Sequence, residues 1–80
     1  MYSEDVFVKE FARKLRRKRE EQSLSLNRLS EISSVSASFI FRIENGERNN
    51  ISIEVLFNLS NALDIDLGEM LERCRSSQDK

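Results

Sequence analysis

The sequence has no histidine, no proline and no tryptophan, and it has only one cysteine and two glycines among its 80 residues. Without histidine, and with Cys74 as the one thiol, neither a zinc finger nor a Ser-His or Cys-His nucleophile pair can be assembled. The sequence also lacks a glycine-rich phosphate loop and a clustered acidic motif. We therefore predict that the chain is not an enzyme and that it uses no metal, no cofactor and no small-molecule ligand.

The shortage of glycine and proline leaves little material for hairpin turns, so the composition favours helices over a sheet. Cys74 has no second cysteine with which to pair, which is typical of a reducing cytoplasm. No apolar run approaches the roughly 20 residues that cross a bilayer, and the first residues lack the basic start of a secretion signal. The sequence predicts a soluble, cytoplasmic, all-α domain that makes no membrane contact.

The segment from Ser25 to Gly46 has the pattern of two short helices joined by a tight turn. Apolar residues recur at helical spacing in two runs, which consist of Leu26, Leu29 and Ile32 and then of Phe39, Ile40 and Ile43. Serines separate the runs. Their hydroxyls form hydrogen bonds with nearby backbone groups in place of helical hydrogen bonds, and so favour turns and caps. This is the form of the helix-turn-helix, which places its second helix in the DNA major groove.

The sequence around this motif resembles the Cro/phage-repressor type of helix-turn-helix protein, also called the XRE family. The resemblance covers about Phe11 to Leu71. Residues that match the first three helices of the family in spacing and type are Leu15, Arg16, Arg19, Leu24, Ser25, Leu29, Val35, Ile40, Ile43, Glu44 and Gly46. The fourth and fifth helices of the family are matched by Leu56, Leu59, Ala62, Leu63 and Leu67. The loop after Gly46, with Ile51-Ser52-Ile53, also resembles the controller proteins of restriction-modification systems.

The resemblance implies a compact, lambda-repressor-like DNA-binding domain of five helices at residues 11–72, with its helix-turn-helix at about 25–46. Residues 1–10 are then the start of the first helix or an N-terminal extension, and residues 73–80 form a polar, frayed tail. Serine at position 34 stands where the family favours glycine, so we expect Ser34 to adopt a positive φ.

The resemblance also assigns roles to single residues. In the family, the arginine matching Arg19 pairs with the glutamate matching Glu44 and ties the first helix to the recognition helix. Arg48 and Asn49, in the loop after that helix, correspond to ligands of the DNA backbone. Leu26 stands where the family usually has a phosphate-binding glutamine, and the neighbouring residues that could contact phosphate instead are Asn27 and Arg28.

The third helix, predicted from about Ser36 to Asn45, is the candidate for reading the groove. Arg42 is the leading base reader, because arginine can bind guanine O6 and N7 in bidentate fashion. The other candidates on its outward face are Ser36 and Ser38 for base edges or phosphate, Ala37 for a thymine methyl, and Asn45 for phosphate. Phe41 has three interpretations, which are packing on thymine methyls, a protein contact, or partial burial against a neighbouring helix.

Charge is divided along the chain. Residues 9–19 contain seven basic side chains and one acidic one, whereas residues 51–72 contain five acidic side chains and no basic one. The basic run is typical either of a solvated helix face or of phosphate contact, for which the candidates are Arg13, Arg17 and Lys18. The acidic helices are expected to lie away from DNA.

Three apolar residues, Ile53, Phe57 and Ile65, fall outside the expected apolar stripes. They either cap the core or form a homodimer interface, and a two-fold dimer would meet two DNA half-sites about one helical turn apart. The sequence thus predicts a transcriptional regulator, such as a repressor, that binds a palindromic operator in double-stranded DNA as a homodimer. The alternative is a helical protein-interaction module, such as an antitoxin or an antagonist of a related repressor, with weak or no DNA binding.

Overall fold

The computed structural model describes residues 4–47 and 50–78, and in this part of the chain it contains five helices and no strand. The helices are α1 (Glu4–Glu21), α2 (Leu26–Ser33), α3 (Ala37–Glu44), α4 (Ile53–Leu63) and α5 (Leu67–Gln78). The predicted all-α, five-helix fold is therefore confirmed. No helix in the described ranges combines the length and the apolar character that a membrane span requires.

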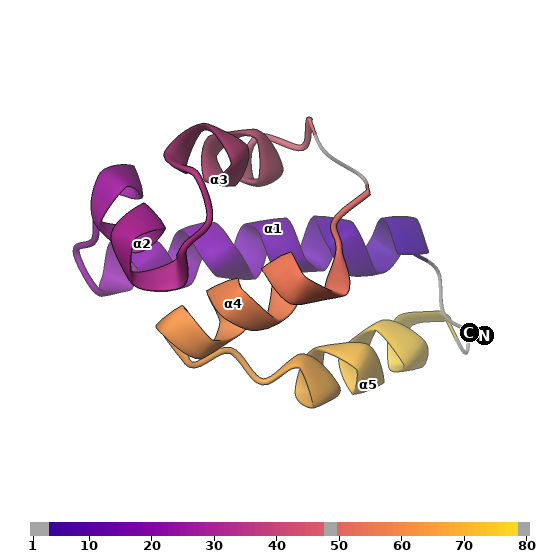
Figure 1. Cartoon of the computed structure of the whole chain (residues 1–80). Coiled ribbons are helices and arrows are strands. Elements are labelled where there is room, and N and C mark those ends of the chain that lie inside the picture. The colour runs from indigo at the N-terminus through magenta and orange to yellow at the C-terminus, as the bar shows by residue number, and fades with distance from the viewer. Residues whose placement is uncertain (1–3, 48–49, 79–80) are drawn as a thin grey trace.

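Helix α1 runs through the middle of the molecule, with α3 on one side and with α4 and α5 on the other (Figure 1). Helix α2 packs against both α3 and α4. Each helix contributes fully or nearly fully buried side chains to one shared core, among them Phe11, Leu15, Leu29, Ile40, Ile43, Leu59, Leu63 and Met70. Because α2 and α3 bury their apolar faces in this core, their opposite faces remain exposed.

Side-chain caps define where four of the helices begin. The Oγ atoms of Ser25, Ser36 and Ser52 accept hydrogen bonds from the backbone N–H three residues later at 3.0, 3.1 and 3.2 Å. Asp66 does the same for Glu69 at 3.0 Å. Such caps satisfy N–H groups that have no partner within the helix, and each contributes about 1 kcal/mol.

Left-handed residues define where the helices end. Ser34 follows α2 with a φ of 64°, as its place at a family glycine position led us to expect, and Gly46 follows α3 with a φ of 75°. Asp64 ends α4 with a φ of 60°. The reversal at Ser34 sets the angle between α2 and α3, and it is stabilised by the N–H of Ser34, which donates to the carbonyl of Ser30 at 2.9 Å.

Ile65 corrects one of the expectations, because it belongs to the core and is only 7% exposed. Its N–H donates to the carbonyl of Ser60 at 2.8 Å, directly after the left-handed Asp64. This is the Schellman ending of a helix, in which the residue after the left-handed position packs back on the last turn. Ile65 is therefore not available for a dimer interface.

Ile32 and the C-terminal segment also differ from expectation. Ile32 is exposed, and Ser33 is buried instead. Ile32 lies six positions after Leu26, so the two side chains point about 120° apart around the helix axis. Helix α5 extends past residue 72, the expected end of the domain, since it continues to Gln78 and Cys74 is buried four residues after Met70.

Candidate nucleic-acid interface

The outward face of α3 carries the residues that the sequence assigned to base contact. Ser36, Ser38, Phe41 and Arg42 are exposed, and Ala37 is partly buried. Arg42 is the cation of this helix, and among the described residues it has no ion-pair partner. Its guanidinium therefore keeps its donors available, which the bidentate recognition of a guanine edge requires.

Ser36 has a structural role as well as its predicted one. Its Oγ accepts the backbone N–H of Phe39 at 3.1 Å and so caps α3. A hydroxyl also has one hydrogen to donate, so the cap does not remove its capacity to donate to a base edge or a phosphate. The same residue therefore fixes the start of α3 and presents a donor there.

A part-buried ion pair holds α3 against α1. Arg19 donates from Nε and from Nη2 to the two carboxylate oxygens of Glu44 at 2.7 and 3.0 Å, and from Nη1 to the carbonyl of Leu24 at 2.9 Å. The Arg19 side chain is 15% exposed and that of Glu44 is 3% exposed. The hydrogen bond to Glu44 raises the pKa of Arg19 above its usual value, although burial acts in the opposite direction.

Asn27 and Arg28, two of the predicted phosphate ligands, lie exposed in the first turn of α2. Arg28 pairs with Glu31 at 3.0 Å, three residues further along the same helix. Both partners are well exposed, and pairs of this kind contribute little, so a phosphate can compete for the guanidinium. The first turn of α2 can thus supply donors next to the outward face of α3.

Asn45 is in part committed to its own helix. Its Nδ2 donates to the carbonyl of Phe41 at 2.8 Å, and the same carbonyl also accepts the backbone N–H of Asn45 at 3.1 Å. A side-chain amide has two hydrogens, which leaves one for a phosphate. Arg48 and Asn49, the ligands that the resemblance assigned to the following loop, lie outside the described residues.

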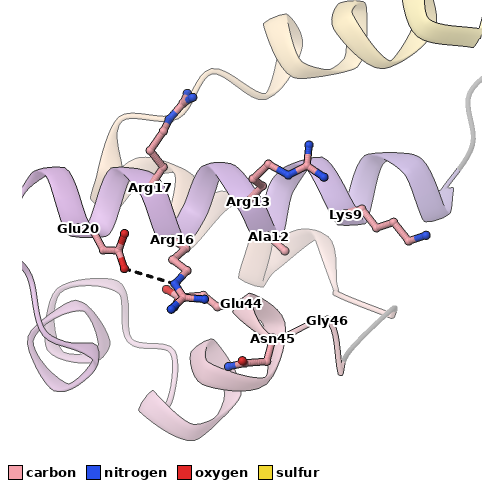
Figure 2. A pocket seen from close by; sticks show the side chains of 9 residues that line it. All are labelled: Lys9, Ala12, Arg13, Arg16, Arg17, Glu20, Glu44, Asn45 and Gly46. Atoms are coloured by element: carbon pink, nitrogen blue, oxygen red, sulfur yellow. Dashed lines mark hydrogen bonds and ion pairs between the residues drawn. The ribbon is translucent and has the colours of Figure 1, made fainter.

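A basic groove of about 430 Å³ runs between α1 and the end of α3 (Figure 2). Its walls include Lys9, Arg13 and Arg16 from α1 and Glu44, Asn45 and Gly46 from the end of α3. In Figure 2 the side chain of Arg16 points toward α3, and its Nε donates to Glu20 at 3.3 Å. Arg16 is therefore a candidate phosphate ligand that the sequence analysis did not select.

Arg17, which the sequence analysis did select, borders the same groove but points away from α3 (Figure 2). Its Nε lies 3.9 Å from a carboxylate oxygen of Glu21. The sequence holds a signal for choosing between the two arginines, because Arg16 precedes Arg19 by three residues and so lies near the face of α1 that contacts α3.

A second groove, of about 640 Å³, lies between the start of α2 and the outward face of α3. It is lined by Arg19, Ser25, Leu26, Asn27, Ala37, Ser38 and Phe41, and its walls are mostly apolar. Phe41 is 50% exposed, a value compatible with all three of its interpretations, partial burial included. This groove is an apolar feature in the middle of a face with polar and basic neighbours.

A separate apolar surface lies on α4. Ile53 and Phe57 are four residues apart, so they share one face of the helix, and both are exposed, Phe57 to 53%. Ile65 does not join them. Elsewhere in the described part of the chain, no three His, Cys, Asp or Glu residues gather in a way that could hold a metal ion.

Comparison with known families gives a match that covers the helix-turn-helix elements described above. A family model described as Helix-turn-helix matches residues 15–70, more than half of the chain. The matched region begins within α1 and ends within α5, so it contains α2, the turn at Ser34, α3 and the Arg19–Glu44 pair. Comparison with curated proteins and with solved structures gives no significant match.

Proposed function

The chain belongs to the Cro/repressor-type, or XRE, family of helix-turn-helix DNA-binding regulators, and on that basis we propose that it recognises a palindromic operator as a homodimer. Helix α3 enters the major groove, and the bound dimer represses transcription by occupying the promoter. The observation that carries this proposal is Arg42, a cation on the outward face of α3 that has no ion-pair partner among the described residues.

Contacts to the DNA backbone surround this reading face in the proposal. Asn27 and Arg28 hold a phosphate at the start of α2, and Arg16 with Asn45 holds another beside the end of α3. Such contacts set the position and orientation of the protein on the duplex, whereas base contacts from α3 select the sequence. The Arg19–Glu44 pair keeps α3 fixed relative to α1, so both kinds of contact act together.

The homodimer forms through Ile53 and Phe57 on α4. Two exposed apolar side chains on one helix face would lose water contact when the same face of a second copy covers them. A two-fold pair also doubles the number of base contacts, which one helix of eight residues supplies sparingly. The expected operator therefore has two half-sites with centres about ten base pairs apart.

One observation favours a second function. Leu26, Ala37 and Phe41 make part of the reading face apolar, and an apolar groove of this kind also suits a protein side chain. In that case the chain is an interaction module, such as an antitoxin or an antagonist of a related repressor. We consider DNA recognition the better supported function, because the chain belongs to a DNA-binding family and because α3 carries Arg42, which has no ion-pair partner among the described residues.

The test is selection of binding sites from random duplex DNA with the purified protein, at low and at moderate salt. Enrichment of a palindrome with half-sites about one helical turn apart supports the dimeric regulator. Enrichment of a single half-site contradicts the dimer and keeps the DNA-binding function. If no sequence is enriched even at low salt, where phosphate attraction is strongest, the DNA-binding function fails and the interaction module replaces it.

A further inference from the structure

The apolar groove between α2 and α3 lacks free polar groups over much of its wall. Of its polar lining residues, Arg19 is bonded to Glu44 and to the carbonyl of Leu24, and Ser25 caps α2. The side chains of Leu26, Ala37 and Phe41 offer only carbon to a ligand. Asn27 and Ser38 are exposed and can offer hydrogen bonds, and the capping hydroxyl of Ser25 keeps one hydrogen to donate.

The fold gives no reason for this apolar surface to remain open to water. Phe41 is half exposed on α3, although the inward face of the same helix is supplied by Ile40 and Ile43, which are fully buried. An exposed apolar side chain is stabilised by any contact that removes water from it. A ligand with an apolar group of small size would therefore gain free energy in this groove.

We propose that this groove binds the C5 methyl groups of thymine in the major groove, so that Leu26, Ala37 and Phe41 give the protein a preference for thymine. This inference rests on the proposed DNA-binding function and names the bases that the site prefers. Among the four base-pair orientations, thymine alone presents an apolar group on the major-groove edge. The methyl group thus has the chemistry that the walls of the groove match.

The charge around the groove is also suited to DNA. No carboxylate is among the described residues that line it, and its charged lining residue is Arg19. Arg42, the next residue of α3, is exposed and has no ion-pair partner among the described residues, so its hydrogen-bond donors are available to DNA. The expected site therefore pairs a guanine, bound by Arg42, with one or two thymines close to it, bound through their methyl groups.

Replacing thymine by uracil tests this inference directly, because uracil keeps the Watson–Crick hydrogen bonds and lacks only the C5 methyl. Two random duplex libraries, one made with thymine and one with uracil, are selected in parallel with the full-length protein. The thymine library should yield a site. Uracil at one or two thymines of that site should then weaken binding about fourfold for each methyl lost, the effect of removing one buried methyl-sized group.

Two variants assign the effect to the groove. Phe41→Ser and Leu26→Gln should each bring the ratio of thymine to uracil affinity toward one. Ile32→Ser is the matched control, since Ile32 is an exposed apolar residue of α2 that does not line this groove, and it should keep the ratio of the original protein. Circular dichroism verifies that every variant remains helical. Phe41→Ser is the more robust variant, because Leu26 also packs against the core.

Each other outcome overturns the inference in a recognisable way. If uracil is accepted at every thymine of an enriched site, the groove does not read methyl groups, although the DNA-binding function stands. If the thymine preference survives in both groove variants, another part of the protein reads the methyl. If no sequence is enriched from either library, the proposed function fails together with the inference. The groove is then assigned to binding a protein side chain, as in the interaction module.

Discussion

Arg19 and Glu44 lie 25 positions apart in the sequence, yet they form a bidentate ion pair with contacts of 2.7 and 3.0 Å. The pair joins α1 to the last turn of α3, and the third contact of Arg19 reaches the backbone between α1 and α2. One guanidinium therefore fixes three segments of the helix-turn-helix unit relative to one another. The carboxylate is nearly inaccessible to water, and Arg19 compensates its charge.

Removal of the Glu44 charge should therefore cost much more than removal of an exposed one. Glu44→Gln keeps the shape of the side chain but leaves the Arg19 guanidinium without a counter-charge. We expect the free energy of unfolding to fall by about 3 kcal/mol, the lower end of the range for breaking a buried pair, because Arg19 retains some access to water. Urea unfolding followed by circular dichroism measures the loss.

Two further variants distinguish the effect of breaking the buried ion pair from the effect of removing any charged side chain. Glu31→Gln breaks the exposed Arg28–Glu31 pair and should cost less than about 1 kcal/mol. The double replacement Arg19→Met with Glu44→Leu removes both charges and should recover most of the stability lost in Glu44→Gln. Equal losses for Glu44→Gln and Glu31→Gln would contradict the structural role of the pair.

Ser34 offers a stabilising substitution. Its φ of 64° is left-handed, and this conformation costs a residue with a Cβ roughly 1 kcal/mol relative to glycine. Ser34→Gly should therefore raise the free energy of unfolding, by up to about 1 kcal/mol. Ser30→Gly, four residues earlier within α2, is the matched control and should lower it by about 0.5 kcal/mol. Opposite signs in the two denaturation experiments are the expected result.

The helices and their ends were largely predictable, because their signals are local. Ser25 and Ser52 could be identified as caps from the sequence, since each is a serine directly before an apolar helical run, and the structure shows both capping hydrogen bonds. Ser34 could be assigned its left-handed φ from the family position that it occupies. Signals of this kind depend on the nearest few residues, so they do not require knowledge of the packing.

The errors concern side-chain direction, which depends on packing between helices. Ile65 was assigned to a surface because the residue after a helix end has no helical periodicity, whereas the Schellman ending turns it into the core. The directions of Arg16 and Arg17 also depend on packing, because the contacts of α1 with α3 settle the rotation of α1 about its axis, and Arg17 stays a prediction as a phosphate ligand. The apolar groove was not predictable either, because Leu26 lies on α2 and Phe41 on α3. Whether the two side chains line one groove depends on the angle between these helices.

Burial of Cys74 should make stability depend on pH in the alkaline range. Burial raises the pKa of this thiol above its ordinary value of 9.0, with a smaller contribution from the negative charge of Glu10. Below pH 9.0 the thiol is protonated in both the folded and the unfolded state, so its contribution is constant. Above pH 9.0 the unfolded state loses the proton first, and the free energy of unfolding should fall by at most about 1.4 kcal/mol per pH unit from this group.

Cys74→Ala isolates that effect from the other groups that titrate at alkaline pH. Urea unfolding of both proteins at pH 8 and pH 10 should show a steeper loss for the original protein than for the variant. The variant itself will be less stable at pH 8, because it removes a buried side chain. A parallel pH dependence of the two proteins would mean that the thiol is not shielded from water.

The proposed dimer depends on the exposed apolar face of α4. Phe57→Glu places a charge where two copies of this face would meet, so the sedimentation coefficient should shift toward that of a monomer while helicity is retained. Ile32→Glu is the matched control, because it changes an exposed apolar residue on α2, and it should leave the assembly state unchanged. If the original protein already sediments as a monomer at high concentration, the α4 interface is wrong.

Arg42 and Arg16 should affect DNA binding in different ways, because one is proposed to contact a base and the other a phosphate. Arg42→Ala should weaken binding to the selected operator by about 1–3 kcal/mol and relax the preference at one base pair. Arg16→Ala should weaken binding to all sequences alike and reduce the slope of log affinity against log salt by about one. Affinities for the operator and for a scrambled duplex, measured over a range of salt concentrations, distinguish these patterns. Equal losses on both duplexes for Arg42→Ala would remove Arg42 from the reading face, since a base contact cannot act on a sequence that lacks the base.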